Sequence, residues 1–186
     1  SGRMSLLASV LAAATGRGEI VALIDTCDRF DPVSAAAAGV ELSNLLWVRG
    51  RGQESSRDLE AIVKRALKAM SLVLDAGGFG VVAFDLADLP ARTIRQIPMM
   101  TWLRLSRLLE NSKTVGVLLG PEPISRSAEG QTVVLRSSST AGCWSGTHGR
   151  NRMLQGLECQ AQVIRARRPR HEFVTLRPEF PRPGSS

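Results

Sequence analysis

Residues 19–32, EIVALIDTCDRFDP, contain the strand around which the rest of the fold can be ordered. Val21 to Ile24 form an unbroken apolar run, which is typical of a parallel strand covered on both faces. The run ends on Asp25, and a polar turn that includes Cys27 follows it. The stretch therefore predicts a buried parallel strand whose carboxyl end carries polar groups.

Strand and helix signals alternate along the first two thirds of the chain. Further continuous apolar runs predict strands at 44–48, 79–86 and 113–120. Apolar residues at helical spacing predict helices over 6–11 and 59–70, and proline opens two more helical stretches at Pro90 and Pro98. This order predicts an α/β fold with a doubly wound, mainly parallel sheet and right-handed crossovers.

The pattern changes after Gly120. A short strand is expected at 132–136, followed by a polar connection rich in glycine and serine over 137–151. Residues 159–180 alternate around the basic corner RRPR, which predicts a C-terminal antiparallel hairpin. We expect one domain over residues 1–180 and a disordered tail over 181–186.

Composition and charge narrow the function classes. No apolar run approaches the roughly 18 residues needed for a membrane span, and three cysteines form no metal or disulfide pattern, so we expect a cytoplasmic protein. The net charge is +7. Residues 150–186 carry eight arginines and three glutamates, which is +5 of that total. An excess of this kind favours a polyanionic partner such as DNA.

Four segments together resemble the RecA-type members of the P-loop ATPase superfamily. Residues 22–50 resemble the segment after the phosphate loop, and FGVVAFDLADLP (79–90) resembles the Walker B strand, with Asp85 beside magnesium. Residues 110–120 resemble the next core strand, and 158–180 the terminal hairpin. The resemblance implies a RecA-like core. Because SGRMSLLASVLAAA at the start resembles the end of a Walker A loop, that core is expected to lack its first strand and the beginning of the loop.

The departures from this family fall on ATP chemistry. A Walker A motif has lysine and then serine or threonine where Arg3 and Met4 stand here. Cys27 replaces the glutamate that activates water, and a thiol with a pKa of about 8.5 is a poor general base. Ser34 stands where an aromatic side chain stacks on adenine, and Gly120-Pro121 replaces the polar side chain that senses the γ-phosphate. The pattern indicates that the fold was kept and hydrolysis was lost.

The chain resembles the ImuA group in its altered ATP site, its short loop at 121–131 and its arginine-rich end. Residues 97–130 carry most of this resemblance. These proteins accompany error-prone translesion polymerases and act with an inactive Y-family polymerase and a DnaE-type polymerase. The resemblance implies a non-catalytic DNA-repair accessory protein of the SOS response. It leaves two alternatives open, namely a divergent ATP-dependent recombinase, which would be a DNA-dependent ATPase, and a scaffold that binds only protein.

The expected site residues form three sets. A degenerate nucleotide site, which would hold ATP and Mg²⁺ weakly if at all, takes Gly2, Arg3, Ser5, Asp31 and Asp85. DNA contacts are expected at Arg126, Arg150 and Arg152, and Arg165 and Arg167 are expected at an interface with a polymerase subunit, RecA or a second copy. No residue is expected to be catalytic or to bind a structural metal. Asp25 remains ambiguous between a cap at the end of its strand and a second acidic group near the phosphates.

Overall fold

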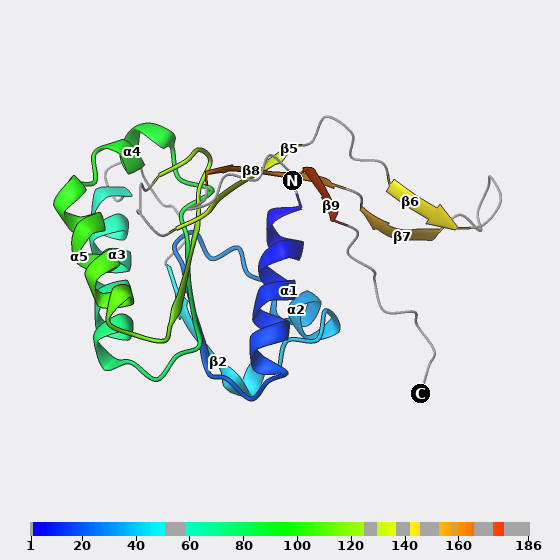
Figure 1. Ribbon diagram of the computed structural model, residues 1–186, viewed down its shortest axis with the longest axis horizontal. Coiled ribbons are helices and arrows are strands. Elements are labelled where there is room, and N and C mark those ends of the chain that lie inside the picture. The colour runs from blue at the N-terminus through cyan, green and yellow to red at the C-terminus, as the bar shows by residue number, and fades with distance from the viewer. Residues whose placement is uncertain are drawn as a thin grey trace.

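Four parallel strands form the centre of the structure (Figure 1). They are β1 (Val21–Asp25), β2 (Leu45–Arg49), β3 (Val81–Asp85) and β4 (Val115–Leu119), in the order β2-β1-β3-β4. The computed structural model describes residues 2–50, 59–124, 130–136, 142–145, 153–157, 159–165 and 173–176. All four predicted strands are present, and each pairs in parallel with its neighbour.

Helices cover both faces of this sheet. One face carries α1 (Arg3–Thr15) and α2 (Pro32–Ala37), and the other carries α3 (Leu59–Ala76) and α5 (Met99–Glu110) (Figure 1). The remaining helical segments are η1 (Leu42–Asn44) and α4 (Ala91–Arg95). Side chains alternate along β1, so that Val21 and Leu23 pack toward α1 while Ala22 and Ile24 pack toward α3. The predicted doubly wound sheet is thereby confirmed.

Two local expectations were wrong. Pro90 and Pro98 were expected to be the first helical residues, but each has an extended ψ and precedes its helix as the N-cap. No helix was predicted after Asp31, whereas α2 begins at Pro32. Proline at the first helical position suits this start, because its missing N–H would have had no intrahelical partner.

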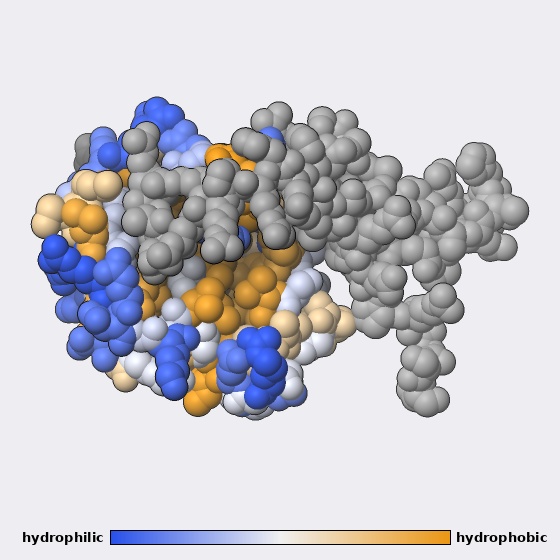
Figure 2. Space-filling view, viewed as in Figure 1, coloured by the Kyte–Doolittle hydropathy of each residue, from blue (hydrophilic) through white to orange (hydrophobic). Residues whose placement is uncertain are grey.

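The outer edge of β4 is apolar. Val115 is 58% exposed and Leu118 36% exposed, and the five residues of the strand include no charge and no proline. Figure 2 shows apolar surface between the two helix layers, where the edge of the sheet faces the viewer. Val115 donates its N–H to Gly80 and Leu119 accepts from Leu86, so the odd-numbered backbone groups of β4 point toward β3. The backbone groups of Gly116 and Leu118 therefore point away from the sheet.

The C-terminal part forms antiparallel pairs. β5 (Thr132–Arg136), β8 (Cys159–Arg165) and β9 (Phe173–Leu176) make one sheet in the order β5-β8-β9, and the β8–β9 pair confirms the predicted hairpin. β6 (Gly142–Ser145) pairs with β7 (Met153–Leu157). The expectation of a connection without strands over 137–151 was therefore wrong at 142–145, because pairing with β7 overrides the polar local composition.

Two further points complete the fold. Among the helices that the structure describes, none combines the length and apolarity needed to cross a bilayer. The predicted tail, residues 181–186, lies outside the described residues.

Candidate functional site

The topology itself points to one crevice. From β1 the chain continues to β2 on one side, and from β3 it continues to β4 on the other side. Ligands of open α/β sheets bind outside the carboxyl ends of strands at such a switch point. The last residues of the two central strands, Asp25 and Asp85, are partners in the register and lie at this crevice.

Asp25 serves as a buried cap at the end of β1. Its side chain is 1% exposed and accepts hydrogen bonds from the backbone N–H groups of Arg29 (2.9 Å) and Phe30 (2.8 Å) and from Nε1 of Trp47 (3.3 Å). Protein donors thus occupy three of the roughly four acceptor directions of the carboxylate, and the side chain is buried. The structure therefore resolves the ambiguity of the sequence in favour of a structural cap.

Asp85 is a buried carboxyl with fewer partners. Its residue is 5% exposed, and Oδ1 accepts a hydrogen bond of 2.9 Å from the backbone N–H of Ala87. Burial raises the pKa of Asp85 above its ordinary value, and the negative charges of Asp25 and Asp88 add to the increase. The Ala87 hydrogen bond and the charge of Arg3 oppose it. The site thus contains a buried carboxyl whose ionised form is disfavoured even though the Arg3 cation lies nearby.

Arg3 is the first residue of α1 and lies at this crevice. Its Nη2 lies 2.7 Å from Oδ1 of Asp88, and Nε of Arg29 lies 3.7 Å from Oδ2 of the same carboxylate. The Nε of Arg3 is buried and has no hydrogen-bond partner among the residues that the structure describes. The guanidinium of Arg3 is therefore engaged with a protein carboxylate at the place where the family resemblance expected a phosphate-binding lysine.

Cys27 lies half-buried among these charges. Its pKa is raised by burial and by the negative charges of Asp88, Asp85 and Asp25, while Arg29 has a smaller opposing effect. A thiol in this setting is protonated at neutral pH. It cannot take a proton from water, which is the step that the glutamate of the resembled family performs.

Asp31 has a separate role. It caps α2, because its carboxylate accepts from the backbone N–H groups of Val33 (3.2 Å) and Ser34 (3.1 Å) and also from the Ser34 hydroxyl. The hydroxyl of Ser34 lowers the pKa of Asp31 most, and the side chain remains solvent-exposed. Asp31, from the expected nucleotide set, and Ser34, at the expected adenine-stacking position, thus contact each other.

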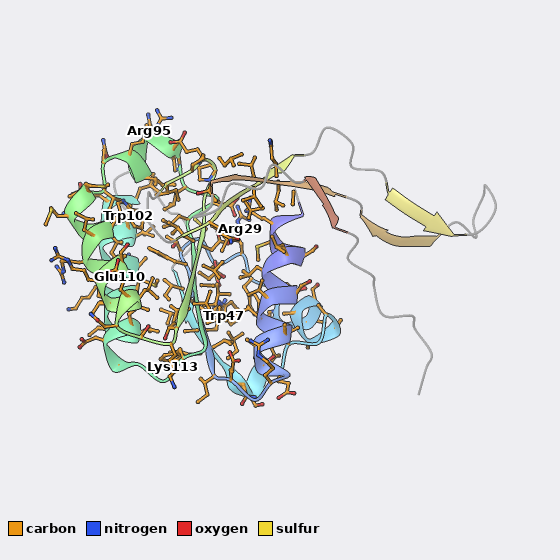
Figure 3. The ribbon with its side chains drawn as sticks, in the orientation of Figure 1. Arg29, Trp47, Arg95, Trp102, Glu110 and Lys113 are labelled. Atoms are coloured by element: carbon orange, nitrogen blue, oxygen red, sulfur yellow. The ribbon has the colours of Figure 1, made fainter. Side chains whose placement is uncertain are left out.

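A second arginine closes the loop next to the crevice. Arg49 donates from Nε (2.9 Å) and Nη2 (2.8 Å) to the two carboxylate oxygens of Asp28, and its guanidinium lies 4.5 Å from the ring centre of Trp47. The Trp47 ring meets Phe30 edge-on at 5.3 Å. Figure 3 labels Trp47 and Arg29 between the sheet and α1. These contacts hold the loop after β1 in one arrangement.

The structure brings together only part of the expected nucleotide set. Arg3 and Asp85 share the crevice, Gly2 is the N-cap of α1 without a side-chain hydrogen bond, and Ser5 lies in the first turn of that helix. Sequence reasoning missed Asp88 and Arg29 as members of the cluster. The signal that could have found Asp88 is its position three residues after Asp85 in DLADLP.

Of the five arginines expected to contact DNA or a partner, only Arg165 falls within the described residues. Arg126, Arg150, Arg152 and Arg167 lie outside the described residues. The backbone of Arg165 ends β8, where it pairs with Thr132. Their expected roles remain predictions.

The residues of the crevice do not fit a magnesium–triphosphate group. Met4 offers no hydroxyl for the metal, Arg3 is engaged by Asp88, and Cys27 is a neutral thiol. In the part of the chain that the structure describes, no group of three His, Cys, Asp or Glu side chains is arranged to hold a metal ion. The chemistry that these residues offer is charge pairing rather than water activation.

The comparisons with known proteins found structural similarity only. No family model matches the chain, and no curated protein matches it. The chain is similar to the crystal structure of the RadB recombinase, with 15% identity and a TM-score of 0.45 over 91% of this chain and 82% of that one. It is also similar to a KaiC-like protein from Pyrococcus horikoshii OT3, with 15% identity and a TM-score of 0.42 over 90% and 76% of the two chains.

The raised pKa of Asp85 predicts a pH-dependent gain in stability on substitution. Because the pKa of Asp85 is raised in the folded protein, the protonated side chain contributes its full stability below the ordinary aspartate pKa. This contribution to the free energy of unfolding is lost as pH rises through the pKa of the folded state. Asp85→Asn removes this loss, so we expect its free energy of unfolding to exceed that of the parent by about 1 kcal/mol at pH 7. Urea titrations between pH 4 and pH 8 should show a difference that grows with pH. A difference that shrinks as pH rises would contradict the prediction.

Proposed function

We propose that this chain is a non-catalytic, RecA-like accessory protein of error-prone translesion DNA synthesis, which acts by binding DNA and polymerase subunits in the cytoplasm. One observation carries the non-catalytic part. The cation at the start of α1, Arg3, is paired with Asp88 at 2.7 Å, beside a cysteine whose thiol is neutral. A site that hydrolysed ATP would need the first group free for phosphate and the second replaced by a base.

The sheet has room for the strand that the resemblance expects before α1. The connection through α2 leads from β1 toward β2, and α1 covers the same face as α2 (Figure 1). A right-handed crossover through α1 into β1 would therefore start from a strand on the opposite side of β1. β3 and β4 already occupy that side, so the strand would add to the apolar edge of β4. The apolar β4 edge of the described residues is where a RecA-like arrangement would place such a strand, which supports the RecA-like part of the proposal.

The binding part of the proposal draws on charge. The +7 net charge and the eight arginines of residues 150–186 favour a polyanion, and Arg126, Arg150 and Arg152 are the proposed DNA contacts. Arg165 and Arg167 are proposed to contact a polymerase subunit, since arginine is enriched at protein interfaces. A protein-only scaffold and a divergent ATP-dependent recombinase are the competing functions.

The test begins with ATP turnover. We expect the chain to hydrolyse ATP at the background rate, with or without single-stranded DNA, because neither phosphate capture nor water activation is provided. Cys27→Glu alone should not raise the rate, since Arg3 and Met4 are unchanged. Phosphate release measured with malachite green reads out both proteins. Turnover by the parent that DNA stimulates would favour the recombinase.

The same samples then test DNA binding against salt. The affinity for a labelled single strand should fall with salt, with a slope of about −0.7 in log K against log salt for each phosphate neutralised. Arg150→Gln with Arg152→Gln should make the slope shallower by about two such contacts. Arg65→Gln with Lys68→Gln, on the exposed side of α3, removes the same charge and should leave the slope nearly unchanged. A salt slope that does not change in the variant with Arg150→Gln and Arg152→Gln would favour the protein-only scaffold.

A further inference from the structure

The outer side of α5 carries an exposed apolar group. Met99, Met100 and Leu103 are 55%, 62% and 41% exposed. They lie within one turn of each other near the start of the helix, and Figure 2 shows apolar surface at this edge of the molecule, next to hydrophilic surface. Large apolar side chains that are exposed together, rather than singly, mark a surface that another molecule covers.

These residues are not needed to hold α5 in place. The inner side of the helix is anchored by Trp102 and Leu105, which are buried in the core that α3 shares (Figure 3). Leu109 packs against Gly116 so closely that a Cβ on this glycine would lie 2.5 Å from the leucine methyl group. The exposed methionines can therefore be changed without removing the contacts that position the helix.

Positive charge continues the same side of the helix. Arg104 follows Met100 by four residues, and Arg107 follows Leu103 by four, so each arginine lies one turn beyond an apolar residue. Neither forms an ion pair with any residue in the described part of the chain. Glu110 is the single acidic residue of the helix, at its last position. We call Met99, Met100, Leu103, Arg104 and Arg107 the α5 surface.

The composition of the α5 surface favours protein over DNA. Contacts to the phosphate backbone need cations but would leave two methionines and a leucine in water. Methionine and arginine are enriched at protein interfaces, whereas lysine is depleted, and α5 has no lysine. Methionine side chains also adapt to differently shaped apolar partners. The partner that fits has apolar side chains beside carboxylates.

We propose that the α5 surface docks an acidic amphipathic helix of a partner protein, with apolar side chains on Met99, Met100 and Leu103 and carboxylates on Arg104 and Arg107. Such a helix presents apolar residues at positions i, i+3, i+4 and i+7, which match one side of α5. This inference goes beyond the proposed function, because it holds whether or not the C-terminal arginines bind DNA.

Two synthetic helices test the proposal. One has leucine at i, i+3, i+4 and i+7 and glutamate on its flanks, and the other has lysine in place of glutamate. We expect the acidic peptide to bind the chain and the lysine peptide not to bind, as measured by fluorescence anisotropy. Met100→Gln with Leu103→Gln should weaken the affinity for the acidic peptide at least about tenfold. Leu72→Gln, on α3, changes a leucine that is 60% exposed and should leave the affinity unchanged.

Charge reversal gives the second arm. The variant with Arg104→Glu and Arg107→Glu should no longer bind the acidic peptide and should bind the lysine peptide. Unfolding cannot produce this switch in binding. Circular dichroism and the fluorescence of buried Trp102 check that each variant folds. The proposal is overturned if the acidic peptide does not bind up to millimolar concentration or binds all variants equally. It is also overturned if single-stranded DNA displaces the acidic peptide from the parent and no longer binds the Arg104→Glu/Arg107→Glu variant, or if Met100→Gln with Leu103→Gln instead dissociates a self-associated form.

Discussion

Replacing Asp25 by alanine is expected to lower the free energy of unfolding by about 3–5 kcal/mol. The carboxylate is buried at the end of β1 and accepts from Arg29, Phe30 and Trp47, so its removal leaves three donors without a partner at the lip of the crevice. The loop that carries Cys27 would lose its fixed arrangement. Urea denaturation followed by tryptophan fluorescence measures the loss.

Asp31→Ala is the matched control for Asp25. Asp31 lies six residues later in the same loop and also accepts from two backbone N–H groups, but its side chain is exposed. The loss of an exposed helix cap costs about 1 kcal/mol, because water replaces the lost acceptor. If Asp25→Ala cost no more than Asp31→Ala, burial of the carboxylate would not be what fixes this loop.

Gly50→Ala is expected to destabilise the fold by about 3 kcal/mol or more. A Cβ at this position would lie 2.0 Å from the carbonyl oxygen of Thr26 and 2.8 Å from that of Asp25. Both are backbone atoms, and Gly50 itself donates to the Asp25 carbonyl at 2.7 Å, so neither strand end can move away cheaply. Thermal unfolding of the variant should show the loss.

Gly18→Ala separates steric conflict from backbone preference. Gly18 has a φ of +78°, and a Cβ there would meet no atom within 4 Å. The substitution therefore costs about 1 kcal/mol, from the left-handed backbone alone. Equal losses at Gly18 and Gly50 would show that close approach of the backbone at Thr26 is not what requires glycine at the end of β2.

The strands and helices could be predicted because their signals are local. β1 and β3 are buried at every position, and both read as continuous apolar runs in the sequence. α3 follows from apolar residues at helical spacing, of which Ile62, Val63, Ala66 and Met70 are buried. The positions of the two central aspartates at strand ends also followed, since parallel strands of one sheet end at the same edge.

The candidate site could be predicted only in part. The sequence located Arg3, Cys27 and Asp85, but it could not say that Asp88 would pair with Arg3, a residue 85 positions away. No periodicity carries that information, because the ion pair depends on where α1 enters relative to the end of β3. Asp31, which was expected in the nucleotide site, instead caps α2.

By itself, then, the sequence determined the class of fold, the order of the four central strands and the main helices, and the absence of an ATPase's usual residues at Arg3, Met4 and Cys27. Only the tertiary structure decided that Asp25 is a buried cap with three protein donors, that Arg3 is held by Asp88, and that Met99, Met100 and Leu103 remain outside the core. The physical reason is that burial periodicity is written along the chain. Hydrogen bonds, ion pairs and exposure of a helix face depend instead on elements that meet from distant parts of it.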